Sequence, residues 1–583
     1  MKKIITEVIL PIYTSVKQIA KTFTRTQWFV FYAGVILVVG GLLGGLIAFN
    51  ESLKVSIPRK GGSFSEGIVG TPRFINPVLA ISDADKDLTQ VLYSGLMKRD
   101  NSGTLIPDLA ESFSVSPDGK VYTFTLKENL YFHDGSKVTA DDIVYTVEMV
   151  QNPLVKSPIK TNWEGITVKK DSDRTVSFTL KQRYVSFLEN TTLGILPKKL
   201  WGSLTPEQFP LSDLNTKPVG SGPYKMDSIT KNSSGIPTSY TLTSFSKFDG
   251  GEAYIKKIHF VFFGNERELV QGLRDGDVDN ISQISPVLVK ELQKEKGYTV
   301  LQTPLPRVFG IFLNQNKNQL FTDAKIREAI NIAINRQALI DNVLYGYGTP
   351  MTSPIPSWLL EKKPETTEPI DSDKVNKLIE SAGYTKGDDG MYVKKGKKGE
   401  SGPRLAFTLT TADAPELKAA AQMIKDQLLP YGIDVTLSIF DSGTLAQTVI
   451  RERSYEALLF GQNVEQEAEL FAFWHSSQRN DPGLNIAMYA NARVDELLEK
   501  IHKTDEKDDR QDIYEKIDTL IQDDIPAIFL YSPSFIYVSN SKGSPTGISL
   551  SHLITPKDRL QNINTWFINT ERVWKWFAHQ PHN

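Results

Sequence analysis

The sequence contains no cysteine among its 583 residues. This absence excludes disulfide bonds, thiolate metal sites and a cysteine nucleophile. It also excludes membrane attachment through a lipid-modified N-terminal cysteine. A chain without thiols is compatible with an oxidising compartment outside the cytoplasm, where an unpaired thiol would be a liability.

Several signatures of enzymes and of nucleic-acid binders are missing as well. The seven histidines are dispersed, and the sequence has neither a His-x-x-x-His pair nor a Gly-x-x-x-x-Gly-Lys phosphate loop. The formal net charge of −2 gives no basic excess that would indicate a nucleic-acid partner. We therefore expect a protein that is not an enzyme, and we expect no metal, no other cofactor and no nucleic acid.

Long apolar segments are also absent, with one exception. Residues 28–49 carry no charge and, as a helix, are long enough to cross the hydrocarbon core of about 30 Å. Lysine and arginine outnumber acidic residues in 1–27, so the positive-inside rule places that segment in the cytoplasm and the rest of the chain outside. We expect a single-pass anchor in a bacterial cell membrane, which contacts the lipid bilayer through residues 28–49 and is followed by a polar tether, residues 50–62.

The competing interpretation of this apolar run is a cleaved signal peptide. A signal-peptide core is usually shorter, and a small-residue cleavage pattern of the Ala-x-Ala type normally follows it. No such pattern follows the run in this sequence. The sequence therefore favours an uncleaved anchor.

The remainder of the chain alternates between strand and helix patterns, which is typical of an α/β fold. Strands are predicted over residues 121–126, 175–180, 240–245, 257–263, 404–410, 433–439 and 455–460. Helices are predicted over residues 140–150, 323–335, 371–382, 416–429, 494–502 and 508–524. Residues 134–135, which follow His133, and residues 220–223 are predicted to be turns and not sites. The basic, glycine-rich residues 387–402 predict a surface loop.

Four sequence blocks carry a resemblance to a known family. The longest is residues 91–153, and the others are PVGSGPY at 218–224, DAKIREAINIAINR at 323–336 and YEKIDTLIQDDIPAIFLY at 514–531. In their order and spacing, these blocks resemble the family 5 extracellular solute-binding proteins, the dipeptide- and oligopeptide-binding group. The resemblance extends from about Gly62 to the C-terminus.

The resemblance implies a two-lobed α/β fold of the periplasmic-binding-protein kind, type II with an extra subdomain. The transmembrane helix expected at residues 28–49 would precede this fold. Two crossings, near residues 301–314 and 527–537, would form a hinge that closes the lobes around a ligand. The implied divisions are lobe I from residues 63–103, 218–299 and 526–583, a strand-rich subdomain from 104–217, and lobe II from 300–525.

The same resemblance implies a function in transport. The protein would capture peptides in the cleft and deliver them to the permease subunits of an ABC importer. Other members of the family bind nickel chelates, haem or oligosaccharides, so a non-peptide solute is an alternative. A membrane-anchored sensory or adhesion receptor is another. Groups that hold charged ligand ends would favour peptides, whereas rows of exposed aromatic rings would favour sugars.

The first candidate ligand residues are two carboxylates. A peptide ammonium in a closed cleft needs a carboxylate, because a buried unpaired charge is costly. Peptide-binding members of the family supply an aspartate after a Gly-Trp-like pair. The matching segment here begins at Gly461, has Gln462 in place of the aromatic residue, and has Glu465 or Glu467 where the aspartate is usual. We expect Glu465, with Glu467, to hold the ammonium; a solvated acidic turn is the competing interpretation.

Five further residues are candidates for the ligand site. Trp474 would bury ligand side chains against its ring, and Arg307 would pair with a ligand carboxylate. Tyr93, Asn76 and Asn314 lie in segments that the resemblance places along the cleft or the hinge. For each of the five, a purely structural role is the competing interpretation.

Overall fold

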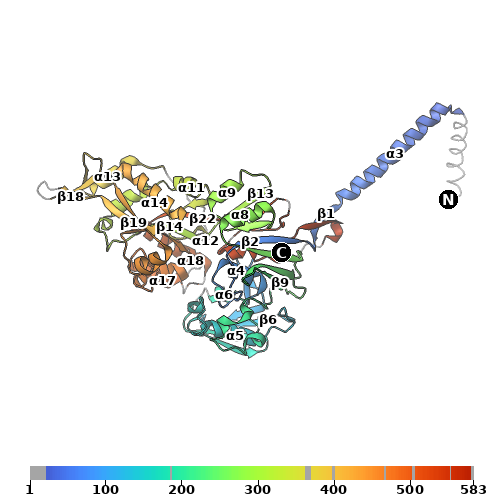
Figure 1. Ribbon diagram of the computed structural model, residues 1–583, viewed down its shortest axis with the longest axis horizontal. Helices are drawn as coiled ribbons and strands as arrows, with labels where there is room; N and C mark the ends of the chain where they lie inside the picture. Colours follow the sequence, from blue (N-terminus) through green and yellow to red (C-terminus); the bar gives the residue numbers. More distant parts are fainter. Residues whose placement is uncertain are drawn as a thin grey trace. The chain divides into compact units, whose positions relative to one another are not determined.

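The computed structural model describes residues 22–183, 187–360, 369–396, 401–464, 468–501, 504, 506–541, 543–551 and 553–578. The chain forms two units. One consists of residues 1–59 together with residues 569–583, and the other consists of residues 60–568. Figure 1 labels many of the elements of both units.

The first unit contains the apolar helix and two strands from opposite ends of the described chain. Helix α3 (Arg25–Ser52) starts at Thr24, whose side chain and that of Gln27 form a capping box. The helix is long and apolar enough to cross a membrane, and none of its residues is buried. Strand β1 (Lys54–Arg59) follows it and pairs antiparallel with strand β23 (Asn569–Trp574). Six residues of the segment predicted to be a tether are therefore in a strand.

The second unit is built on a sheet of twelve strands. Ten of them follow one another in the order β20-β19-β21-β14-β22-β12-β2-β11-β10-β9, while β13 and β15 pair with β22. Their bounds are β2 Ser63–Val69, β9 Tyr224–Lys231, β10 Pro237–Ser244, β11 Lys257–Phe263, β12 Asn280–Ser282, β13 Tyr298–Pro304, β14 Arg307–Leu313, β15 Gly348–Pro350, β19 Ala406–Ala412, β20 Asp434–Phe440, β21 Ala457–Asn463 and β22 Ala527–Asn540.

Strand β22 connects the two halves of this sheet. Its first part pairs with β14, where Phe309 lies opposite Tyr531, and its second part pairs with β13, where Pro304 lies opposite Ser534. Only two residues separate β13 from β14. The crossings predicted at 301–314 and 527–537 thus fall on strands that adjoin each other in the sheet.

Helices cover both faces of the half that contains β14, β19 and β21. Alternate residues of a strand point to opposite faces, and here Ile311 packs into one apolar cluster while Phe312 packs into another. The first face is covered by α10 (Ala324–Ala333), α11 (Arg336–Val343), α13 (Ser372–Ser381) and α14 (Pro415–Leu428). The second face is covered by α12 (Ser357–Leu360), α16 (Ala468–Trp474), α17 (Ala492–Ile501) and α18 (Lys507–Asp524).

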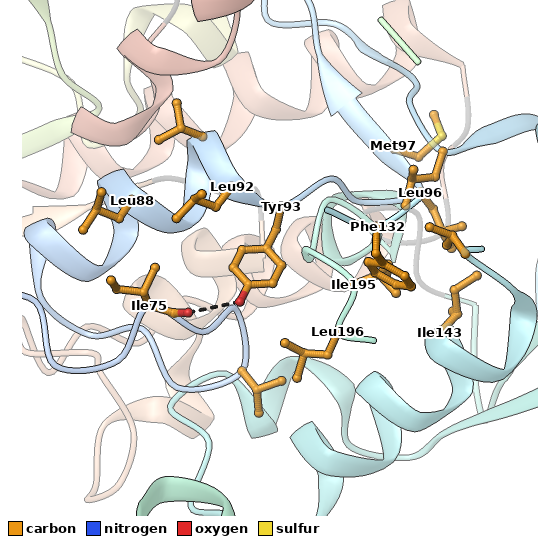
Figure 2. Packing of buried hydrophobic residues seen from close by; sticks show 14 of the residues in the cluster. Ile75, Leu88, Leu92, Tyr93, Leu96, Met97, Phe132, Ile143, Ile195 and Leu196 are labelled. Atoms are coloured by element: carbon orange, nitrogen blue, oxygen red, sulfur yellow. Dashed lines mark hydrogen bonds between the residues drawn. The ribbon is translucent and has the colours of Figure 1, made fainter. Parts of the chain in front are cut away.

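The other half of the sheet shares its core with the strand-rich segment that was predicted as a subdomain, residues 104–217, which we name the insert. A single apolar cluster contains Phe64 of β2, Tyr240 of β10 and Phe124 of the insert. Figure 2 shows part of this cluster, where Leu92 and Ile195 lie on either side of Tyr93. The elements of this half are α4 (Asp83–Leu92), α8 (Glu266–Asp275), α9 (Pro286–Leu292), the pair β3 (Met97–Arg99) and β4 (Leu105–Pro107), the insert strands β5 (Ala110–Val115), β6 (Val121–Leu126), β7 (Ile166–Ser172) and β8 (Thr175–Leu180), and the insert helices α5 (Ala140–Gln151), α6 (Phe187–Asn190) and α7 (Lys198–Trp201).

The periodicity predictions for secondary structure are largely confirmed. Strands β6, β8 and β11 have the predicted bounds, and the six predicted helices are present, displaced by no more than two residues. Helix α13 ends before Gly383, which adopts a left-handed conformation with φ of 90°. The surface loop predicted at 387–402 is partly wrong, because it contains β17 (Tyr392–Lys395) and the start of β18 (Ser401–Arg404), which form a small sheet with β16 (Tyr384–Lys386).

Candidate functional site

One edge of the sheet gathers the ends of several strands. Strands β19, β20 and β21 are parallel, so their carboxyl ends meet at the same edge; these ends are Ala412, Phe440 and Asn463. Strand β14 runs the other way and begins there, with Arg307 opposite Asn463. Strand β22 reaches it at Tyr531. We name this region the carboxyl edge. Ligands of open α/β sheets bind outside the carboxyl ends of the strands, so it is the candidate binding site.

Aromatic rings line the carboxyl edge at close quarters. Phe309 stacks on Tyr531, with the ring centroids 5.3 Å apart and the planes 18° from parallel. The ring of Phe309 also covers Gly461, where an added Cβ would lie 2.6 Å from the ring. The glycine in the predicted ligand segment therefore makes room for an aromatic side chain of the neighbouring strand.

Arg307 is the cation of the carboxyl edge. Arg307 is partly buried, and its guanidinium has no ion pair or hydrogen bond with the described residues. Asp83, in the first turn of α4, lies within its electrostatic reach. Burial raises the pKa of the Asp83 carboxyl and the charge of Asp87 raises it further, whereas Lys86 and Arg307 act in the opposite direction. The charge of Arg307, on one half of the sheet, thus acts on a carboxyl group of α4, in the other half.

The two carboxylates predicted to hold an ammonium, Glu465 and Glu467, lie outside the described residues. The chain that leads to them is described. Strand β21 ends at Asn463 on the carboxyl edge, and the Val464 amide donates to the Pro306 carbonyl at 2.7 Å. Glu465 therefore follows a residue that is hydrogen-bonded directly beside Arg307.

Two of the other predicted site residues are buried in the shared core. The Tyr93 side chain is 5% exposed, and its hydroxyl donates to the Ile75 carbonyl at 3.2 Å, as Figure 2 shows. Asn76 is fully buried; its amide donates to the Asn215 side chain at 3.0 Å and its oxygen accepts from the Val78 amide. The hydrogen bonds of both residues are contacts within the core, which are the contacts that a purely structural role would require.

The remaining two predicted residues are also buried. Asn314 closes the turn after β14, because its side chain donates to the Arg453 carbonyl at 3.1 Å and accepts from the Asn316 amide. Trp474 is 1% exposed and packs against Phe312 and Phe529 in the core between α16 and the sheet. The structure brings Arg307 and the start of the Glu465 segment together and places the other four candidates in the core.

A separate cavity of about 330 Å³ lies between α4, the insert and the 3₁₀ turn Pro556–Leu560. Charged side chains line it, and four of them form two ion pairs: Arg99 with Glu189, and Lys98 with Asp108 at 3.3 Å. None of the carboxyl-edge residues lines this cavity. Among the described residues, no group of three or more histidines and carboxylates gathers in a way that would hold a metal ion.

Sequence reasoning missed three features of the carboxyl edge, namely Asp83, Phe309 and Tyr531. The alternation within β14 predicts that Phe309 and Arg307 share a face of their strand. No local pattern indicates that residue 309 meets residue 531, or that residue 83 faces residue 307, because both relations depend on which strands become neighbours.

Comparisons with known proteins agree with this architecture. The model of the bacterial extracellular solute-binding proteins, family 5 Middle, matches residues 104–481. The oligopeptide-binding protein AppA of Bacillus subtilis is 27% identical over 548 residues, which are 92% of this chain and 97% of that protein. The dipeptide-binding protein of Escherichia coli is 24% identical over 491 residues, 79% of this chain and 87% of that protein.

Solved structures show the same fold. The structure of AppA from Bacillus subtilis in complex with a nonapeptide matches with a TM-score of 0.66 and 25% identity, covering 88% of this chain and 100% of that one. NikZ from Campylobacter jejuni in complex with Ni(L-His) matches with a TM-score of 0.67 and 24% identity, covering 87% and 99%. These matches extend over nearly the whole length of both proteins.

Proposed function

This chain belongs to the bacterial extracellular solute-binding proteins of family 5, and from that premise we propose that it captures peptides and delivers them to the permease subunits of an ABC importer. The observation that carries the peptide assignment is the 27% identity to an oligopeptide-binding protein over 92% of this chain. The same relative is similar in structure and was solved with a nonapeptide. The relatives are binding proteins, so a receptor role in transport accounts for the fold without catalysis.

The charges at the carboxyl edge suit the two ends of a peptide. Arg307 presents a guanidinium that no described carboxylate occupies, and a guanidinium matches a carboxylate with two parallel hydrogen bonds. Glu465 follows β21 on the same edge and would hold the ammonium. In our proposal, closure of the hinge on β13, β14 and β22 brings α4 over the bound peptide.

The first prediction concerns Arg307. In the variant Arg307→Gln, affinity for peptides with a free C-terminal carboxylate falls about 10- to 100-fold, because a charge-assisted pair is worth about 1.5–3 kcal/mol. Isothermal titration calorimetry of the full chain in detergent, with a library of short peptides, measures this loss. Peptides with an amidated C-terminus bind the wild type and the variant equally.

The matched control for this experiment is Arg451→Gln. Arg451 pairs with Asp481 at 3.2 Å on the surface, and both side chains are well exposed, so its removal leaves peptide affinity unchanged. Glu465→Gln is the corresponding test at the other end, read against N-acetylated peptides. If the free and amidated peptides lose affinity equally in Arg307→Gln, Arg307 does not hold the carboxylate. Binding of a nickel–histidine chelate, with no peptide bound, would replace the peptide assignment and leave family membership intact.

We also propose that α3 remains attached and anchors the protein in the membrane, with residues 1–27 in the cytoplasm. The last turn of α3 supports this, because it contacts the folded C-terminal strand: the Trp574 indole donates to Asn50 at 3.0 Å, and Arg572 pairs with Glu51. We expect the membrane fraction to contain the intact 65.3 kDa chain, resistant to alkaline carbonate. Intact mass spectrometry checks this. A lighter, soluble chain that begins after the helix would identify α3 as a signal sequence.

A further inference from the structure

Three large aromatic side chains are exposed together near the C-terminus. Trp574 is 43% exposed, and Trp576 and Phe577 are each 67% exposed. The Trp574 ring lies 6.0 Å from that of Trp576 and stacks on Phe577 at 6.3 Å. We name these three residues the aromatic platform. Exposed aromatic rings that form a contiguous patch mark a surface that contacts something other than water.

The aromatic platform is fastened to the C-terminal end of α3. Strand register places Trp574 opposite Lys54, two residues after the helix. The Trp574 indole donates to the Asn50 side chain at 3.0 Å, and the Lys575 amide donates to the Leu53 carbonyl at 2.9 Å. Trp574 and Lys575 are thus held at the point where the apolar helix ends.

A second aromatic group lies at the opposite end of the same helix. Trp28 stacks on Tyr32 at 5.3 Å and meets Phe31 edge-on at 5.7 Å. At 1.5 Å of rise per residue, about 33 Å of helix separates Trp28 from Asn50. This length matches the hydrocarbon core of about 30 Å. The two aromatic groups therefore flank the apolar run at the spacing of the two membrane interfaces.

We propose that the aromatic platform inserts into the outer headgroup interface of the membrane that α3 crosses. Tryptophan is enriched at this depth, because its ring is apolar while its N–H seeks a polar partner. Lys575, next to the rings, places a cation at the level of the lipid phosphates. This inference rests on the proposed role of α3 as an anchor and adds a second membrane contact, contributed by the far end of the chain.

With this second membrane contact, the tether between the membrane and the rest of the protein consists of two chain connections and not one. Two chain connections, 59–60 and 568–569, join the first unit to the second unit, residues 60–568, which we name the solute-binding unit. With β1 and β23 paired and the aromatic platform in the interface, both connections start from a fixed ribbon at the membrane surface. A receptor held in this way stays at a high effective concentration near a permease in the same membrane.

Depth-dependent fluorescence quenching tests this inference on the full chain. The protein is reconstituted alone into vesicles of phosphatidylglycerol and phosphatidylcholine that carry bromine either near the headgroup or near the end of the acyl chains. The difference between the wild type and the double variant Trp574→Phe, Trp576→Phe isolates the emission of the platform. The difference between the wild type and Trp28→Phe isolates the emission at the other end of α3.

We expect bromine near the headgroup to remove about half or more of the platform emission, and bromine at the acyl ends to remove little, as for tryptophan at an interface. Quenching of Trp28 without quenching of the platform would overturn the inference, while the role of α3 as an anchor would stand. A protein partner would then be the molecule that covers the platform. Absence of quenching from both would overturn the anchor and, with it, this inference.

Discussion

Replacing Arg559 with leucine lowers the free energy of unfolding of the solute-binding unit by about 3–5 kcal/mol, because removal of one partner leaves buried charges unpaired. The Arg559 side chain is fully buried and pairs with Glu66 at 3.1 Å and with Asp87 at 2.6 Å. The Tyr537 hydroxyl donates to the other oxygen of Glu66 at 2.7 Å. Without the guanidinium, two carboxylates would remain in the core with too few partners.

This cluster joins parts of the chain that are far apart in sequence. Glu66 lies on β2, Asp87 on α4, Tyr537 on β22 and Arg559 on the 3₁₀ turn Pro556–Leu560. Burial raises the pKa of Glu66, and the charge of Arg559 opposes that rise. One guanidinium therefore ties the residues after β22 to the start of the unit, beside the apolar packing of Trp566 against Phe64.

Chemical unfolding followed by fluorescence, on the full chain in detergent, measures the loss. Arg274→Leu is the matched control, because its pair with Glu295 at 2.7 Å is at the surface and is worth less than about 1 kcal/mol. The triple replacement of Arg559, Glu66 and Asp87 by apolar residues recovers much of the stability, because no buried charge is then left unpaired. A loss below about 1 kcal/mol in Arg559→Leu would show that the cluster does not stabilise the fold.

The parts of the fold that local chemistry controls were predictable. Helix α10 shows this, because its periodic apolar residues and its capping residue Asp323 are adjacent in sequence. The pairing of β1 with β23 was not predictable, since more than 500 residues separate them and neither strand has a strong pattern. Strand β17 was not predictable from the sequence, because Tyr392 is its only buried residue and it lies within a basic, glycine-rich stretch.

The site was predictable to a smaller extent. Arg307 was a candidate because its segment is expected to line the cleft or the hinge and a guanidinium can pair with a carboxylate, and the structure places it on the carboxyl edge. Trp474, by contrast, lies in the core. The sequence could not show this, because an aromatic residue at helical spacing packs equally well against a sheet or a ligand. Asn76 and Asn314 hold turns through side-chain hydrogen bonds, and no pattern in the sequence separates that role from ligand contact.

The second large effect is on stability in acid, and it originates at His133. The Gly220 amide donates to Nδ1 of His133 at 3.2 Å, so the ring proton is on Nε2, which donates to the Gly222 carbonyl at 3.1 Å. Protonating Nδ1 would break the first of these bonds. The two glycines pack closely against the end of α4, where a Cβ on Gly220 would lie 2.0 Å from the Leu92 carbonyl oxygen. The neutral imidazole thus holds the turn at 220–223 against that helix.

Burial of the ring lowers the pKa of His133 from 6.5 to about 4. The unfolded chain therefore binds this proton more readily than the folded protein does. The stabilisation from the neutral ring is fully present above pH 6.5 and is lost as the pH falls toward 4, which amounts to at most about 3 kcal/mol. We expect the free energy of unfolding to fall over this window.

Unfolding curves recorded between pH 7 and 4 for the wild type and for His133→Gln check this expectation. The glutamine variant is less stable at neutral pH, because it loses part of the hydrogen bonding to the turn, but its stability depends less on pH across the window. His259→Gln is the control for the loss of a histidine, since His259 lies in strand β11, outside the turn, with one hydrogen bond to Thr241. An equal slope in the wild type and in His133→Gln would assign the acid sensitivity to other groups, and the turn at 220–223 would then stand without a neutral histidine.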